Sequence, residues 1–347
     1  MRVFYQPSYV VLRQENQLFP PVFCELSPNL SDPFIKLLEA LRSNLIAQSM
    51  NAPVLLFAYK RPVELQATLR ALQANHLASQ SDLYIFVDAP KRPDDEPKVA
   101  QVRQMLDEVT GFRSIQRDYA STNIGCADSI IRGISQVLTE HPSAIIVEDD
   151  LITAPNFLDF MNQCLEQYAD NPRIYSIAGY TMPFQKPANH TTDAYCIPRH
   201  SPWGWATWAN RWQSVDWDMT DYPEFSLDKW QQKEFMRGGS DLLGMLRDQM
   251  EGRADAWDIR FCYNRFKADG LTVYPTISKV ENIGFGKDAT HTDIYNRYKT
   301  SLDKGDQRTF DLPIMQGPTP YYHRQTVEHY SVPTRIYNRL KTLAGMR

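Results

Sequence analysis

The chain has 347 residues, of which 43% are hydrophobic and 22% are charged, a composition that is ordinary for a globular protein. This length provides for one large α/β domain with additions or for two closely joined domains. The formal net charge of -4 argues against a general nucleic-acid-binding protein, which would carry a marked basic excess.

The cysteines and the apolar segments indicate the compartment. The five cysteines are widely spaced and never form a C-x-x-C pair, so neither a zinc cluster nor a disulfide framework is suggested. Residues 1–17 contain no basic stretch followed by an apolar core, so no signal peptide is apparent. The most apolar run, 52–58, is far too short to cross a bilayer. We expect a soluble cytoplasmic protein.

Residues 1–50 read as an N-terminal extension. The segment 3–12 is rich in Val and Tyr, which predicts a strand or a hairpin. Asp32 and Pro33 then mark the start of a helix, as its N-cap and its first helical residue. Apolar residues recur at helical spacing over 34–46, so we expect this helix to pack on the main body.

Between residues 51 and 150 the pattern alternates between strands and helices. Apolar segments predict strands at 54–58, 83–87 and 144–147, and 113–117 is a candidate for a further strand between them. Helices are predicted from Pro62 onward and over 127–138. Strands that alternate with helices form right-handed βαβ units. The predicted fold is therefore α/β, a Rossmann-like, mainly parallel sheet flanked by helices, with additions at both ends of the chain.

Acidic residues follow two of these strands. Asp88 comes after 83–87, and Glu148, Asp149 and Asp150 follow 144–147. In parallel sheets, ligands gather at the carboxyl ends of the strands. Both acidic positions are therefore candidates for ligand contact.

The acidic triplet 148–150 is the strongest chemical signal. Three successive carboxylates repel one another unless a cation lies nearby. Hard divalent cations take oxygen ligands and commonly bridge carboxylates to phosphates. The alternative is a solvated acidic turn that caps the next helix. The apolar strand before the triplet and the helix-opening segment 153–155 after it favour a metal site.

The residues around the triplet resemble a known family. Val-Glu-Asp-Asp-Leu at 147–151, followed by Ala-Pro-Asn-Phe at 154–157, resembles the metal-binding D-x-D segment of GT-A-fold glycosyltransferases. It is particularly similar to the N-acetylglucosaminyltransferase I type, in which E-D-D-L is followed by A-P-D-F-F. The resemblance extends, more loosely, over residues 53–291. It implies that Asp150 ligates Mn²⁺ or Mg²⁺, while Glu148 and Asp149 contact the ribose or the donor sugar.

Three further segments carry the implied nucleotide contacts. The segment 58–62 resembles the first strand–loop of that fold, which touches the nucleotide, although Tyr59-Lys60 stands where a Cys-Asp or similar pair is common. Asp88 lies where such enzymes recognise the base, usually uracil. Asn-Ile-Gly at 123–125 is similar to the N-x-G-x-A segment of bacterial family-2-like transferases. The nucleotide-sugar contacts implied by these segments are Ala58, Tyr59, Arg61, Asp88, Asn123 and Gly125.

A tryptophan-rich segment, 202–208, is followed closely by Arg211 and Trp212. Indole faces stack on sugar rings, and a glycine lets a ligand approach the backbone. The alternative is a core loop. The family has a comparable P-G-L-G-W segment that lines the donor-sugar pocket. The binding candidates are Trp203, Gly204 and Trp205.

An acidic segment further along the chain provides a candidate base. An inverting transfer needs a group that removes the proton of the acceptor hydroxyl. The segment 255–260 resembles the family's W-D-D-W, whose aspartate is taken to be that base. Asp258 fits best, with Asp255 as the reserve, and the alternative is a helix-start acid near Arg260.

The segment 282–291 contains two glycines and reads as a mobile loop. Its Lys287 and His291 are candidates to meet the diphosphate or the metal. The alternative is a surface turn.

Together these segments predict a metal-dependent, inverting glycosyltransferase that moves a sugar from a UDP-linked donor to a saccharide or lipid-linked saccharide. On this interpretation 51–150 binds the nucleotide sugar and 151–310 binds the acceptor and carries the catalytic residues. A sugar nucleotidyltransferase is one alternative, but it normally carries a Gly-rich basic loop after the first strand, and 58–62 has no glycine. A non-catalytic carbohydrate-binding protein is the other, and it leaves the triplet unexplained.

Residues 311–347 form a tail that is rich in Pro and Tyr and then basic. Ile336, Leu340, Leu343 and Ala344 recur at helical spacing among basic residues. A short basic amphipathic helix binds anionic lipid, or it docks on its own domain. Peripheral contact with the inner face of the membrane is therefore one expectation for the tail, and docking is the other.

Overall fold

The computed structural model describes three strands within residues 1–50, then residues 51–285 and 295–344, and Met346. The chain divides into two compact units, 1–50 and 51–347. In the first unit, β1 (Arg2–Gln6) and β2 (Tyr9–Arg13) form an antiparallel hairpin, and β3 (Cys24–Glu25) pairs antiparallel with β2. The predicted hairpin is confirmed, and the helix predicted from Asp32 lies outside the described residues.

The second unit is built around an eight-stranded sheet with the order β10-β12-β9-β11-β7-β4-β5-β6. Its strands are β4 (Val54–Ala58), β5 (Asp82–Val87), β6 (Ser114–Tyr119), β7 (Ser143–Glu148), β9 (Ile174–Ala178), β10 (Ala194–Ile197), β11 (Trp205–Trp208) and β12 (Leu271–Pro275). β10 and β11 run in one direction and the other six strands run in the opposite direction. The expected α/β class, with a mainly parallel sheet flanked by helices, is confirmed.

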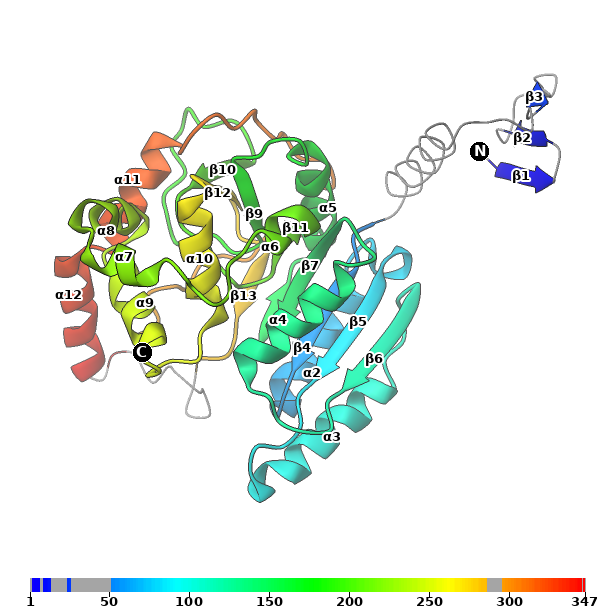
Figure 1. Cartoon of the computed structure of the whole chain (residues 1–347), viewed down its shortest axis with the longest axis horizontal. Coiled ribbons are helices and arrows are strands. Elements are labelled where there is room, and N and C mark those ends of the chain that lie inside the picture. The colour runs from blue at the N-terminus through cyan, green and yellow to red at the C-terminus, as the bar shows by residue number, and fades with distance from the viewer. Residues whose placement is uncertain are drawn as a thin grey trace. The chain divides into compact units, whose positions relative to one another are not determined.

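Helices cover both faces of this sheet, and Figure 1 shows α4 and α10 in front of it. They are α2 (Pro62–Gln73), α3 (Glu96–Asp107) and α5 (Phe157–Gln167) on one face, and α4 (Cys126–Val137), α6 (Ala209–Gln213) and α10 (Trp257–Lys267) on the other. β4 shows why two layers form. Val54, Leu56 and Ala58 pack with the first group of helices, and Leu55 and Phe57 with the second. A strand without a polar face is stable only when both faces are covered.

The remaining helices extend the second unit beyond the sheet. They are α7 (Tyr222–Leu227), α8 (Lys229–Phe235), α9 (Leu242–Met250), α11 (Pro320–His329) and α12 (Val332–Leu343), with short 3-10 turns at Ala78–Gln80, Pro93–Asp95 and Met236–Gly238. Apolar residues of α7, α8 and α9 form a cluster with α10. Within the described ranges, no helix has the length and apolar character needed to span a bilayer.

A small second sheet separates the acidic triplet from the helix that follows. β8 (Leu151–Thr153) pairs antiparallel with β13 (Val280–Asn282). The helix expected to open at 153–155 therefore begins later, at Phe157 after the N-cap residue Asn156, because Thr153 is used in β8. This pairing lays residues 280–284 beside the triplet.

Candidate active site

The loops after β4, β5 and β7 meet at one edge of the large sheet. β4 lies between β5 and β7, and its last residues pair with the ends of both. Tyr59, Asp88 and Asp149 therefore follow the carboxyl ends of neighbouring strands, where α/β folds bind their ligands. β11 runs the other way and begins at Trp205, so Gly204 reaches the same edge.

The acidic triplet forms the end of a strand and a fixed turn. Glu148 is the last residue of β7, and Asp149 and Asp150 make the turn before β8. The backbone N–H of Tyr59 donates to Oδ2 of Asp149 over 3.0 Å. The hydroxyl of Thr68 on α2 donates to the carbonyl of Asp149 over 2.9 Å and accepts from the first N–H of β8. The turn is held by α2 and is separated from α5 by β8, so it does not cap a helix.

Arg61 supplies a positive charge to this turn. Its Nη1 lies 2.6 Å from Oδ2 of Asp150 and 4.0 Å from Oδ1 of Asp149. The side chains of Arg61 and Asp150 are 23% and 13% exposed, so water screens this ion pair only partly. One guanidinium faces three carboxylates.

Burial and the excess of negative charge at this turn raise the pKa values of its carboxyl groups. Burial, and then the charges of Asp150, Asp149 and Asp258, raise the pKa of Glu148 to about 8. Burial and the charge of Asp150 raise the pKa of Asp149 to about 7, against the opposing effects of its bond to Tyr59 and of Arg61. Burial also raises the pKa of Asp150, although Arg61 opposes this. The site therefore favours an added positive charge, either as protons or as a cation.

The chemistry of this turn fits a hard divalent cation. The Asp150 carboxylate lies close to Gly284, so that a Cβ at residue 284 would stand 2.1 Å from its Oδ2 and would displace the carboxylate. In the described part of the chain, no group of three His, Cys, Asp or Glu side chains could hold a metal ion. A cation bound here by the described residues would need further ligands, and Mg²⁺ typically combines one or two carboxylates with substrate phosphates. Arg61 occupies Oδ2 of Asp150, so a metal bound through that oxygen would compete with the guanidinium.

Asp88 holds the loop between β6 and α4. Its carboxylate accepts from the backbone N–H groups of Ile124 and Gly125 over 3.1 and 3.0 Å, and from Nδ2 of Asn123 over 2.9 Å. Gly125 has a φ of +88°, where a side chain would strain the backbone. Asp88, Asn123 and Gly125, three of the expected nucleotide contacts, are thus one hydrogen-bonded unit in which the carboxylate positions the loop.

Asp255 and Asp258 lie near this loop and the triplet. Asp255 precedes α10, and its Oδ2 is 3.1 Å from where a Cβ on Gly125 would stand. Asp258 is half-buried in the first turn of α10. Burial, and then the charges of Glu148, Asp255 and Asp258, raise the pKa of the Cys126 thiol. The structure therefore brings together the two candidate base residues and the triplet, which are far apart in the sequence.

Trp203 lies beside a small cavity next to the triplet. Its ring contacts Tyr180, Tyr298 and Phe285, with centroid separations of 4.7, 5.5 and 5.7 Å. Together with residues of β13, these rings line the cavity. Trp203 is half-buried, so part of its surface remains accessible.

Gly204 and Trp205 serve the packing of the core. A Cβ on Gly179 would lie 2.6 Å from the carbonyl oxygen of Gly204, so two chain segments touch through their backbones. Trp205 is 0% exposed and stacks on Trp257, with ring centroids 5.1 Å apart. A ligand has no access to Trp205 in this structure, and the tryptophan-rich segment divides into an accessible residue and a core residue.

The remaining candidates differ in how they are placed. Ala58 is buried at the end of β4, immediately before Tyr59. Lys287 and His291 lie outside the described residues. Sequence reasoning did not select Thr68 or Cys126, which lie in helices whose apolar pattern is all that the sequence displays.

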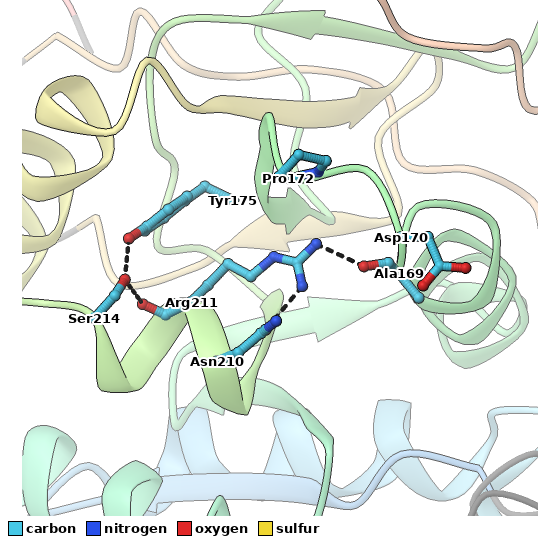
Figure 2. Close-up of a pocket in the computed structure, with 7 residues that line it drawn as sticks. All are labelled: Ala169, Asp170, Pro172, Tyr175, Asn210, Arg211 and Ser214. Carbon is cyan, nitrogen blue, oxygen red and sulfur yellow. Dashed lines mark hydrogen bonds between the residues drawn. The ribbon is translucent and has the colours of Figure 1, made fainter.

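A separate pocket of about 400 Å³ lies at the start of β9, and Figure 2 shows the residues around it. Because β9 runs in the same direction as β7, its start faces the opposite edge of the sheet from the triplet. In this pocket, Arg211 donates to the carbonyls of Ala169 and Asn171 over 2.6 and 3.1 Å, and to Oδ1 of Asn210 over 2.8 Å. The guanidinium is occupied in holding the end of α5, so the pocket is not part of the candidate site.

Comparison with known proteins identifies no family. No protein-family model matches the chain. No curated protein sequence matches it either.

The solved structures that are distantly similar to this chain include a mannosyltransferase and TarS. One is the mannosyltransferase PcManGT from Pyrobaculum calidifontis in complex with GDP-Man and Mn²⁺, at 12% identity and a TM-score of 0.30, covering 49% of this chain and 51% of that one. The other is S. aureus TarS, at 10% identity and a TM-score of 0.38, covering 66% of this chain and 35% of that one. The chain thus spans about half of the first protein and about a third of the second. Similarity this distant does not assign a function.

Proposed function

We propose that the chain is a metal-dependent, inverting glycosyltransferase of the GT-A type. Its donor would be a UDP-sugar that carries a hexose or an N-acetylhexosamine, and its acceptor a saccharide or a lipid-linked saccharide. The observation that carries the proposal is the convergence, at one edge of the parallel sheet, of the acidic turn 148–150, Arg61, Asp258 and the accessible Trp203.

The donor half of the site is formed by the ends of β4, β5 and β7. Asp150 would ligate Mn²⁺ or Mg²⁺, and such a cation supplies positive charge beside the leaving diphosphate. Arg61, once displaced from Asp150, is positioned to pair with a phosphate oxygen, since a guanidinium matches phosphate geometry. The loop that Asp88 holds would provide backbone groups to contact the nucleobase of the donor. Trp203 offers a ring surface to the sugar.

Asp258 is the proposed base on the acceptor side. Its carboxylate would take the proton of the acceptor hydroxyl while that oxygen attacks the anomeric carbon. Its half-buried position excludes part of the water, and its charge acts on Glu148 of the triplet, so it lies close to the proposed donor side of the site. Asp255 is exposed just before the helix and is the reserve candidate.

The two alternatives explain less of this site. A nucleotidyltransferase would need a phosphate-cradling loop after β4, but that loop contains no glycine and enters α2 at once through Pro62. A carbohydrate-binding protein would use Trp203 but has no use for three crowded carboxylates whose pKa values are raised.

Titration calorimetry with UDP-sugars, with and without Mn²⁺, tests the proposal. The wild-type protein should bind a UDP-sugar in the presence of Mn²⁺ and much more weakly in EDTA. Asp150→Asn should remove this metal dependence. Asp107→Asn is the matched control, because it is the same chemical change at a carboxylate that is 61% exposed at the end of α3. The control should bind like the wild type.

The outcomes separate the three functions. Mn²⁺-dependent donor binding, followed by release of UDP when an acceptor is added, supports the transferase. Release of pyrophosphate from a nucleoside triphosphate and a sugar phosphate would identify a nucleotidyltransferase. Binding of free saccharides with no response to Mn²⁺ or to UDP-sugars would leave only the carbohydrate-binding function. Metal-dependent binding that survives Asp150→Asn would disprove the role of Asp150.

A further inference from the structure

α12 has its polar and apolar faces reversed. A helix that packs on a globular protein normally turns its apolar stripe inward and its polar residues toward water. α12 has no buried residue, yet its sequence is strongly amphipathic. Figure 1 shows it, in red, at the outer edge of the second unit.

The polar face of α12 is the one that contacts the rest of the unit. The hydroxyl of Thr342 accepts from the backbone N–H of Tyr295 over 3.0 Å, and the ammonium of Lys341 lies 3.4 Å from the hydroxyl of the same tyrosine. Arg335 reaches Ser240, 3.3 Å from its hydroxyl. The partly covered positions of the helix are Ser331, Thr334, Asn338, Lys341 and Thr342, all of them polar.

The apolar residues face away from the protein. Successive residues in a helix are rotated by about 100°, so positions four, four and three residues apart form one stripe. Val332, Ile336, Leu340 and Leu343 have this spacing and are 53%, 57%, 58% and 76% exposed. Tyr337 flanks the stripe and is 58% exposed. A stripe of this kind is stable in water only at a cost, and it marks a surface that is covered by something else.

The charges around the stripe have one sign. Residues 331–346 contain no Asp or Glu, whereas Arg335, Arg339 and Lys341 lie on the helix. Arg335 and Arg339 are exposed, and neither forms an ion pair within the described ranges. The residues next to the stripe therefore attract an anionic surface.

We propose that α12 binds a membrane surface rich in anionic lipid, lying in the plane of the interface with its stripe among the acyl chains. Arginines beside an apolar stripe extend to phosphate headgroups, and a tyrosine at its edge suits the boundary between lipid and water. This inference rests on α12 alone and goes beyond the proposed transferase activity.

The charge pattern favours lipid over a second copy of the chain. Packing two α12 stripes against each other would bring the arginines of both helices together without a carboxylate between them. Like charges at such an interface oppose association, whereas each cation near an anionic membrane surface makes binding more favourable.

Vesicle flotation with the full chain tests the inference. The probes are vesicles of equal parts phosphatidylcholine and phosphatidylglycerol, and vesicles of phosphatidylcholine alone. The test variant is Ile336→Asp combined with Leu340→Asp. Leu227→Asp combined with Ile314→Asp is the matched control, because it makes the same change at two apolar side chains that are each 81% exposed elsewhere on the surface. A third variant, Arg335→Ala with Arg339→Ala, removes charge and leaves the stripe.

The wild type and the matched control should float with the anionic vesicles. The stripe variant should lose about tenfold or more of its partition coefficient, and the arginine variant should lose about tenfold on anionic vesicles only. Because all the substituted residues are exposed, we expect unchanged melting temperatures, which would show that the variants fold.

Three results would overturn the inference. The wild type could fail to float, or the stripe variant could float as well as the wild type. The matched control could also lose vesicle binding to the same extent as the stripe variant. A concentration-dependent dimer of the wild type that the stripe variant abolishes would assign the stripe to a second copy instead. None of these measurements needs a sugar donor, so their failure is distinguishable from failure of the transferase proposal.

Discussion

At the scale of single residues, we propose that Arg61 and a divalent cation compete for the carboxylate of Asp150. In this structure the guanidinium lies 2.6 Å from Oδ2 of Asp150 and neutralises part of the charge of the turn. Burial and neighbouring charge still leave Glu148 and Asp149 with raised pKa values. On this proposal, Arg61 fills the metal position in the absence of ligand and moves to the phosphates when metal and donor bind together.

Arg61→Gln tests this competition. Without metal the variant should be less stable than the wild type by about 1–3 kcal/mol, because it loses a charged hydrogen bond and leaves three carboxylates uncompensated. Mn²⁺ alone should raise the melting temperature of the variant more than that of the wild type, because the cation no longer displaces an arginine. The measurement is thermal unfolding in EDTA and in rising Mn²⁺. An equal Mn²⁺ response in both proteins would rule out the competition.

Asp258→Asn should separate the chemical step from donor binding. The amide keeps the shape of the side chain but cannot accept the proton, so we expect sugar transfer to fall by about 10²–10⁴-fold. Donor binding should survive because none of the described residues expected to contact the nucleotide sugar or the metal lies on α10, where Asp258 lies. If Asp258→Asn stays active and Asp255→Asn is inactive, Asp255 is the base. Proton NMR of the fresh product tests the stereochemistry independently, and retention of configuration would exclude a single displacement.

At the scale of secondary-structure elements, the sequence predicted what local pattern controls. The strands of the parallel half and the acids at their ends could be located because each βαβ unit is local and its strands are continuous apolar runs. The pairing of β8 with β13 joins residues 151–153 to 280–282, and no local pattern encodes it. α3 was missed because its apolar residues, Val99, Val102 and Leu106, are sparse among polar ones.

The same limit applies to the tryptophan-rich segment. Its composition did not distinguish the half-buried Trp203 from the fully buried Trp205, because partners from distant elements cover Trp205. One distant partner is Trp257 on α10, and the nearby His200 joins both rings, lying 4.9 Å from that of Trp205 and 5.8 Å from that of Trp257. The cluster supports the start of α10, where Asp258 lies.

His200 gives this aromatic cluster a dependence on pH. Its Nδ1 lies 3.2 Å from the hydroxyl of Ser176, and its Nε2 has no hydrogen-bond partner in the described part of the protein. Burial, and then the charges of Arg265 and Arg199, lower the pKa of His200 well below its usual value. The folded protein thus keeps this ring neutral. In the unfolded chain the ring becomes protonated once the pH falls below about 6.5.

The contribution of His200 to the stability of the fold should therefore fall as the solution is acidified. The contribution of His200 is fully present above its unfolded pKa of about 6.5 and is lost below it, with a slope of up to about 1.4 kcal/mol per pH unit. His200→Phe keeps an aromatic ring but cannot be protonated, so its melting temperature should fall less between pH 7.5 and pH 5 (values that bracket the usual His pKa of about 6.5). His323→Gln, at the surface of α11, is the control. Equal pH slopes in the wild type and His200→Phe would contradict this role.

At the scale of the whole molecule, the candidate site belongs to one of the two compact units. The sheet, its covering helices and every described site residue lie within 51–347. The same unit contains residues of both predicted functional halves, since β9, β11 and β12 share the sheet with β4, β5 and β7. A division at residue 150 can thus describe binding roles but not separate folding units. The orientation of α12 is likewise a property of the whole unit, because the sequence shows two faces but not which one meets the protein.

Residues 51–347 should consequently fold and bind donor without the first 50 residues. The described residues of the four apolar clusters in the second unit all come from Ala52 onward, so this unit contains a large core of its own. We expect cooperative thermal unfolding of the fragment within a few degrees of the second unit in the full chain, because a change of about 1 kcal/mol shifts such a domain by only about 2–4 °C. Mn²⁺-dependent binding of a UDP-sugar should also be retained, since the described contacts proposed for the donor come from residues after 51. The comparison is calorimetry of both proteins under identical conditions. A fragment that unfolds without cooperativity would show that the first 50 residues complete the core, and a folded fragment that no longer binds donor would place part of the site among them.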